Sequence, residues 1–354
     1  MFKIYVFVFL FVFSSFLYSK NKHPYKPNDI IKRIDKLLLD NCCTPNNKDF
    51  VKYLKEKGIT YPIEASVFRV FKKEQVMEIW AKNKDMKTMV KVMVIPIAAM
   101  DFEPSPKFRR GDHKTPEGFY RGNILYGSSN FFMWMKLNEK EIDEYGVVRD
   151  GSSFKICIDY PNNLDRWKSS VNGINTGGSI CVHGNAISDG CVSFKNRNFL
   201  PAFSFAKHHN SKKYGRIQYH IYPFDFSKVK DLRKEAKKYS ENSYFTEAQL
   251  YQFWLNLKTG YDFFNKHKNP IKWQVKKLFF RQGDSSVHIK GIKVILNEEK
   301  LFNGDLSSEL FTSELKKSIK AFQKINKLTT DGVLGMKTLD KMGYIYGEYV
   351  FSLH

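Results

Sequence analysis

The glycine-rich segment at residues 177–191 constrains the fold of this chain more than any other segment does. It places His183 and Cys191 eight positions apart, and Gly184 and Gly190 lie between them. The residues that end at His183 form a short apolar run with the length of a buried strand, and the two glycines allow the following loop to turn back. The segment therefore predicts a strand and a returning loop that bring Cys191 to His183.

A cysteine beside a histidine indicates nucleophilic catalysis. A thiol reacts as the thiolate, and a neighbouring imidazole that accepts its proton activates it near neutral pH. Cys181 is a rival nucleophile, but it lies two positions from His183 on the same strand, so the two side chains stand side by side along one face. We therefore interpret Cys181 and Cys157 as small core residues. The alternative to a catalytic pair is that His183 and Cys191 are two unrelated buried residues.

The five cysteines leave the pairing question open. A catalytic Cys191 must stay free, and an odd count suits a free thiol in an oxidising compartment. Cys42 and Cys43 could form disulfides with partners that the sequence does not assign. No cysteine spacing matches a zinc site of the CxxC type, so neither a metal nor a cofactor is predicted.

Two sequence blocks carry a family resemblance. HG at residues 183–184 followed by SDGC at 188–191 resembles the HG…SxGC catalytic signature of the YkuD-type L,D-transpeptidases, which act on bacterial peptidoglycan. Upstream, PKFRRGDHKTPEGFY at residues 106–120 resembles the family's GDxxTPEGxY turn. Residues 69–74, 222–224 and 253–261 are similar to the YafK-like branch. The resemblance covers about residues 60–275.

The C-terminal part of the chain resembles a second family. AFQ at residues 321–323 and DGV at 331–333, with Gly335 and Thr338, are marks of the peptidoglycan-binding type 1 module. Met336 stands where that family often has proline. The resemblance implies three short helices over residues 279–345, whose predicted core contains Ile292, Leu296, Phe322 and Leu339.

The resemblance implies covalent acyl transfer. Cys191 would attack the carbonyl on the L-centre of the third stem-peptide residue and form a thioester, while His183 shuttles the proton. The family pattern suggests that the main-chain carbonyl of Gly184 orients the imidazole; Asp189 is the alternative. Backbone N–H groups of Asp189, Gly190 and Cys191 are the candidate oxyanion donors.

Further candidates surround this core set. Ser188 is expected to form a hydrogen bond within the loop rather than to act directly. Lys107, Arg109 and Arg110 are candidates for binding substrate carboxylates, although solvated surface charge is an equal interpretation. Residues 115–118 are expected to shape a turn.

The acyl acceptor decides the reaction. If water accepts the acyl group, the enzyme is an L,D-carboxypeptidase or amidase. If an amine accepts it, the enzyme forms a 3-3 crosslink or attaches a protein to the wall. The family often has arginine or asparagine soon after the cysteine; here VSF follows at residues 192–194, which favours hydrolysis. The expected partners are peptidoglycan stem peptides and a wall-linked protein. A protein that anchors to the wall without catalysis is the alternative from another class.

The N-terminus predicts export to the periplasm or cell wall. Residues 1–19 combine a basic start, an apolar run at 4–17 and a small residue, Ser19, as a secretory signal peptide does. The run is shorter than the roughly 20 residues of a membrane span, although an uncleaved anchor is the alternative. In a cytoplasmic protein, a net charge of +22 would suggest a nucleic-acid partner, but the predicted export argues against such a partner. Either anionic envelope polymers or a general abundance of lysine explains the charge.

These patterns predict an α+β protein, with a mostly antiparallel β catalytic domain, flanking helices and a small three-helix C-terminal module. The expected division is a signal peptide at 1–19, a helical segment at 20–60, the catalytic domain at 61–275 and the module at 279–345. Strands are predicted within 66–81, 88–99, 131–137, 154–159 and 218–224. Helices are predicted at 28–39, 50–57, 228–240 and 246–267, the last with an aromatic face in the core.

Overall fold

The computed structural model describes residues 50–126, 154–170, 173–184, 188–194, 212–345 and 347–354, with single positions between 198 and 209. The predicted signal peptide, the helix at 28–39, the strand at 131–137 and residues Cys42 and Cys43 lie outside the described residues.

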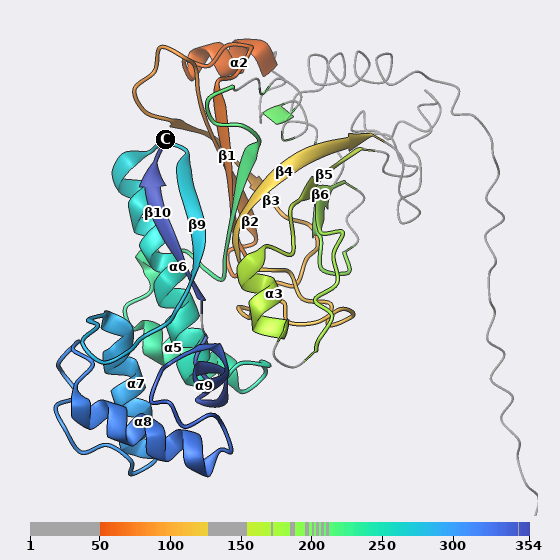
Figure 1. Ribbon diagram of the computed structural model, residues 1–354. Helices are drawn as coiled ribbons and strands as arrows, with labels where there is room; N and C mark the ends of the chain where they lie inside the picture. The colour runs from red at the N-terminus through yellow and green to blue at the C-terminus, as the bar shows by residue number, and fades with distance from the viewer. Residues whose placement is uncertain are drawn as a thin grey trace, which may run out of the picture.

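An eight-stranded sheet forms the larger part of the molecule (Figure 1). Its strand order is β3-β2-β1-β8-β4-β5-β6-β7, and only the pairs β1–β8 and β6–β7 are parallel. This confirms the mostly antiparallel α+β fold. The strands are β1 (Ala65–Phe71), β2 (Val76–Lys82), β3 (Val90–Pro96), β4 (Gly118–Tyr126), β5 (Phe154–Ile158), β6 (Cys181–His183), β7 (Val192–Ser193) and β8 (Ile217–Tyr222).

The helices of this domain pack their apolar faces against the sheet. They are α2 (Phe50–Glu56), α3 (Asn163–Ser170), the 3-10 turn η2 (Phe226–Lys228), α5 (Leu232–Ser240) and α6 (Glu247–His267). Helix α6 begins after a capping box formed by Thr246 and Gln249. Its predicted aromatic face is buried in one cluster with Phe119 of β4 and Tyr222 of β8. Helix α5 begins later than predicted, because Asp231 caps it after the separate turn η2.

After the C-terminal module the chain returns to the sheet domain. The sequence analysis did not predict this return. Strand β9 (Ile271–Lys277) pairs antiparallel with β10 (Gly347–Leu353), so that Ile271 lies opposite Leu353. Figure 1 shows this two-stranded ribbon along helix α6. Phe119 of the large sheet contacts Tyr349 and Phe351 of β10, with ring centroids 5.0 and 4.9 Å away. The last strand therefore belongs to the sheet domain, and the module lies between β9 and β10.

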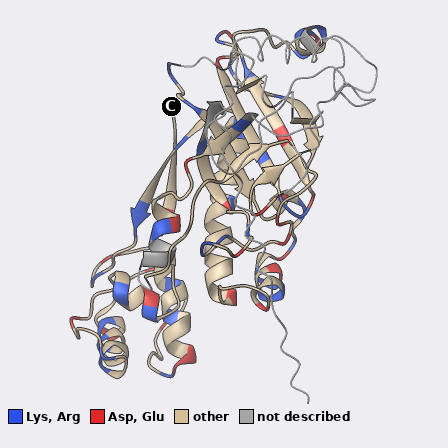
Figure 2. Cartoon of the chain, turned by 90° about the vertical axis from the view of Figure 1, so that its right-hand side faces the viewer, with Lys and Arg blue, Asp and Glu red and all other residues tan. Residues whose placement is uncertain are grey.

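The module consists of α7 (Val287–Glu298), α8 (Ser313–Ile325) and α9 (Met336–Lys341) around a separate core. The four predicted core residues are all buried in this cluster. Gln323 joins α8 to the following turn, because its side-chain amide donates to Asp331 Oδ1 and Thr338 Oγ1 and its oxygen accepts from Gly332 N–H. Lys and Arg are spread over both the sheet domain and the module (Figure 2).

None of the helices among the described residues has the length and apolarity to cross a membrane.

Candidate active site

Strand β6 ends at the predicted base, and strand β7 begins directly after the predicted nucleophile. Their parallel register pairs Val182 with Val192 and His183 with Ser193. Continued back by one residue, this register sets Cys191 beside Cys181, and the Cys181 N–H donates to Cys191 Sγ at 3.4 Å. Strand geometry then separates the Cα atoms of Cys191 and His183 by about 8 Å, within reach of two side chains. The structure therefore brings Cys191 and His183 together at one end of the sheet.

The imidazole of His183 is held by its own strand end. Its Nδ1 lies 2.5 Å from the Gly184 carbonyl oxygen, which also accepts from Ser193 Oγ at 3.0 Å. A carbonyl only accepts hydrogen bonds, so Nδ1 carries the proton and Nε2 of the neutral ring is unprotonated. The main-chain carbonyl of Gly184 thus makes the contact that the family pattern suggested, and it leaves Nε2 able to take a proton.

Burial holds both partners in their neutral forms. Burial lowers the pKa of His183 below its usual value, and the positive charge of Lys155 lowers it further. The hydrogen bond to Gly184 opposes this by raising the pKa. Burial raises the pKa of Cys191, although the Cys181 N–H and Lys155 oppose this. Cys191 Sγ also lies 3.7 Å from the Ser179 carbonyl, which can accept only from a protonated thiol. Both pKa shifts and this contact favour a neutral thiol and imidazole over an ion pair.

The loop before Cys191 is shaped by Ser188 and Gly190. Ser188 Oγ donates to the Cys191 carbonyl at 2.5 Å and accepts from Gly190 N–H at 3.2 Å, as expected for a residue that holds the loop. Gly190 has a φ of +104°, and a Cβ there would lie 2.8 Å from the Lys114 carbonyl oxygen. Only glycine fits this position, and the loop is therefore in direct contact with the 106–120 block.

The predicted cations of the 106–120 block differ in what they can reach. Lys107 is only 5% exposed, and its Nζ contacts Asp112 Oδ1 at 2.5 Å. Its charge is therefore used inside the turn, and the prediction that it binds substrate is not supported. Arg109 and Arg110 are exposed, with the Arg109 guanidinium 5.1 Å from the Tyr244 ring.

A second contact joins this block to the catalytic loop. The exposed side chains of His113 and Asp189 pair through Nδ1 and Oδ1. Asp189 therefore faces His113, and the imidazole of His183 is bonded to a carbonyl instead. The structure does not support Asp189 as the residue that orients His183.

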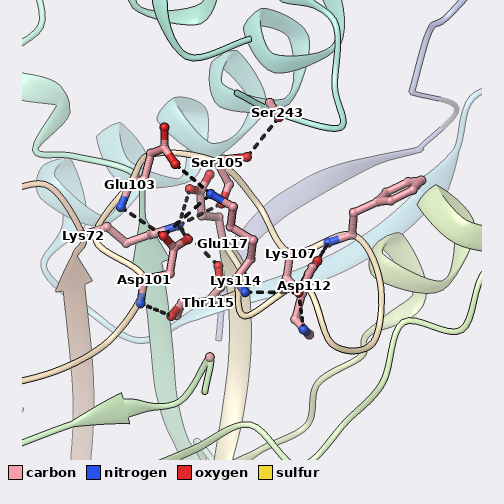
Figure 3. Close-up of polar contacts among 12 residues, drawn as sticks. Lys72, Asp101, Glu103, Ser105, Lys107, Asp112, Lys114, Thr115, Glu117 and Ser243 are labelled. Carbon is pink, nitrogen blue, oxygen red and sulfur yellow. Dashed lines mark hydrogen bonds and ion pairs between the residues drawn. The ribbon is translucent and has the colours of Figure 1, made fainter. Parts of the chain in front are cut away.

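A buried ion pair fixes the base of the same block (Figure 3). Lys72 and Glu117 are both fully buried, 3.2 Å apart, and the Trp254 indole N–H of α6 donates to Glu117 Oε2 at 2.8 Å. Lys72 Nζ also donates to Asp101 Oδ2 and to the Ser105 carbonyl. Glu117 is thus more than the turn residue that the sequence predicted. A charged pair at the bottom of the block was missed, because sequence spacing gives no sign that Lys72 of β1 reaches it.

Cys157 and Cys181 are joined by a disulfide between directly opposed residues of β5 and β6. The sequence left the pairing of these two small core residues open, and the structure joins them because antiparallel pairing brings their Cβ atoms within bonding range. Cys191 is the one free cysteine of the described part of the chain. Within that part, no group of three or more His, Cys, Asp or Glu side chains could hold a metal ion.

Comparisons with known proteins agree with this architecture. Residues 291–342 match the family described as "Putative peptidoglycan binding domain". The chain is 25% identical over 231 residues to the "Putative L,D-transpeptidase YafK" of Escherichia coli K12, covering 64% of this chain and 74% of that protein; the protein of the same name from E. coli O157:H7 matches equally. These matches confirm the resemblance found in the sequence.

Solved structures also align with the chain. The helical cell shape determining protein Pgp2 from Campylobacter jejuni gives a TM-score of 0.28 at 16% identity, over 64% of this chain and 82% of that one. Bd1075 of Bdellovibrio bacteriovorus gives 0.27 at 17% identity, over 63% and 79%. At these TM-scores the alignments bear on neither the fold nor the function.

Proposed function

We propose that this chain, which is L,D-transpeptidase-like and carries a C-terminal peptidoglycan-binding domain, is an exported hydrolase that cleaves peptidoglycan stem peptides through Cys191. The observation that carries the proposal is a free cysteine directly before β7, diagonally across from the carbonyl-anchored histidine that ends β6. The scissile bond follows the carbonyl on the L-centre of the third stem residue. The module would hold the enzyme on its polymeric substrate.

In the first step, His183 Nε2 takes the thiol proton as Cys191 Sγ attacks the substrate carbonyl. The resting pair is neutral, so His183 acts as a general base during attack rather than as one half of a preformed ion pair. The tetrahedral oxyanion needs fixed N–H donors, and those of Cys191 and Asp189 are the proposed ones. Gly190 N–H joins them only if it leaves its 3.2 Å contact with Ser188 Oγ.

The tetrahedral intermediate then collapses to products. The C–N bond breaks, the departing amine takes the proton from His183, and an acyl thioester remains on Cys191. Water, deprotonated by the same Nε2, then attacks the thioester and restores the thiol. Arg109 and Arg110, which are exposed, are the proposed partners of substrate carboxylates.

Hydrolysis is proposed over crosslinking because of the residues that follow the nucleophile. Val192, Ser193 and Phe194 are fully buried, so no side chain directly after Cys191 is presented to an incoming stem peptide. An acceptor amine would need such contacts, which hold it in place for attack, to compete with water, which is present in large excess. The products are then those of an L,D-carboxypeptidase or of an amidase that releases a linked peptide or protein.

Product analysis tests this assignment. Purified protein is incubated with sacculi and with soluble tetrapeptide muropeptides, and the products are identified by mass spectrometry beside the Cys191→Ala variant. Loss of the terminal residue, or release of a linked peptide, supports the hydrolase. Cys191-dependent dimers would instead establish a transpeptidase, and retention on sacculi without any product would leave a wall-anchoring protein.

A further inference from the structure

Lys155 stands out because a buried lysine shares one face of the sheet with the candidate catalytic pair. The antiparallel register of β5 and β6 sets Lys155 directly opposite His183, just as Cys157 lies opposite Cys181. Directly opposed residues point to the same face, so Lys155 and His183 are neighbours. Lys155 is only 4% exposed, and burying a lysine costs free energy unless its charge is used.

The charges around Cys191 determine how Lys155 acts. Among the described residues, the positive charges of Lys155 and Lys107 lower the pKa of Cys191, and the negative charge of Asp189 raises it. The charge of Lys107 is already neutralised by Asp112 at 2.5 Å, and the side chain of Asp189 is 77% exposed and paired with His113. Of these two cations, Lys155 is therefore the one whose charge is left to act on the thiol. The same cation is the charged neighbour that acts on His183.

Building on the proposed function, we propose that Lys155 is an electrostatic positioning residue that stabilises the Cys191 thiolate while keeping His183 neutral. An ammonium attracts the thiolate and repels an imidazolium, so it favours the state in which sulfur is charged and Nε2 is again free. The proton lost from sulfur passes through His183 Nε2 to solvent or to the leaving amine. Lys155 therefore supplies the positive charge that an imidazolium provides in a simple cysteine–histidine ion pair.

The inference predicts changes of defined sign in two pKa values. Lys155→Met should raise the pKa of Cys191, because attraction to the thiolate is lost, and should also raise the pKa of His183, because repulsion is lost. An opposite charge at close range is worth about one pKa unit or more, so thiolate alkylation below neutral pH should slow roughly tenfold. Lys155→Arg, which keeps the charge, should restore both values toward those of the parent.

The experiment follows alkylation of Cys191 by iodoacetamide between pH 5 and 10, with the Cys191 peptide quantified by mass spectrometry, and titrates His183 by NMR. Lys82→Met on β2 is the matched control, since it removes another buried lysine, four positions away from β5 in the strand order of the same sheet. Lys155→Gln replaces Lys155→Met if the latter does not fold. The expected result is that both pKa values rise in Lys155→Met and in neither Lys155→Arg nor Lys82→Met.

Two results would overturn the inference: an unchanged thiol pKa in Lys155→Met, or equal shifts in Lys155→Met and Lys82→Met. Alkylation requires no turnover, so this outcome is independent of the proposed function. Cys191-dependent cleavage of muropeptides can be observed even if Lys155→Met leaves the thiol pKa unchanged. Conversely, the thiol pKa can depend on Lys155 even if no muropeptide is cleaved.

Discussion

Replacing Lys72 with methionine removes the cation from the buried pair beneath the 106–120 block. Glu117 would keep the Trp254 N–H at 2.8 Å but lose its ammonium partner at 3.2 Å, and Asp101 and the Ser105 carbonyl would each lose a donor. Removal of one member of a buried ion pair costs about 3–5 kcal/mol, because the remaining charge stays desolvated. The double variant Lys72→Met/Glu117→Gln leaves no unpaired charge and should recover at least about 1 kcal/mol of this loss.

The pH dependence of the Lys72→Met variant has a defined sign. Burial already raises the pKa of Glu117 in the native protein, and Lys72 opposes that rise. Without Lys72 the folded-state pKa rises further above the unfolded value. The folded state then binds more protons than the unfolded state across that window, so the variant should lose stability as pH rises through it.

Urea unfolding followed by tryptophan fluorescence measures this loss in the sheet domain. All five tryptophans precede residue 278, so the signal does not report the module. Lys293→Met is the control, because this buried lysine of α7 donates to the Asp305 and Ser308 carbonyls of the module. Its loss should leave the tryptophan transition unchanged. A cost below about 1 kcal/mol for Lys72→Met, or a double variant less stable than the single one, would refute the reasoning.

Three further outcomes are expected. Gly190→Ala should destabilise the protein by about 1–3 kcal/mol and abolish Cys191-dependent cleavage, because residue 190 has a φ of +104° and a Cβ there would lie 2.8 Å from the Lys114 carbonyl oxygen. Thermal melting and product assays check this, and full activity would contradict it. Cys157→Ser should cost about 3 kcal/mol in urea unfolding, since the disulfide with Cys181 spans 24 residues; an unchanged midpoint would contradict it. Because burial raises the pKa of Cys191, its alkylation rate should still be rising above the ordinary thiol value of about 8.5, and a plateau near pH 6 would show a preformed thiolate instead.

The candidate site was more predictable from sequence than its surroundings. His183, Gly184 and the loop glycine Gly190 lie within eight residues of Cys191, so local spacing was enough to indicate how they meet. Ser188 was also predictable, because a hydroxyl three residues before the cysteine can close a turn with the backbone. The aromatic face of helix α6 followed from its helical periodicity.

The long-range contacts were not predictable. Lys72 meets Glu117 across 45 residues of sequence, and β10 pairs with β9 across an entire module. The disulfide between Cys157 and Cys181 depends on a strand register that spacing does not give. Lys107 looked like a surface cation because sequence does not reveal burial, whereas the structure pairs it with Asp112 inside the turn.

Trapping the acyl enzyme tests the central claim most directly, namely that Cys191 is a nucleophile served by His183. The protein is incubated with a carbapenem or a tetrapeptide muropeptide, quenched in acid, and mapped by intact-mass and peptide mass spectrometry. The account predicts one thioester on Cys191, formed much more slowly in His183→Ala and absent in Cys191→Ala. An adduct on any other residue, or equal rates of acylation with and without His183, would contradict it.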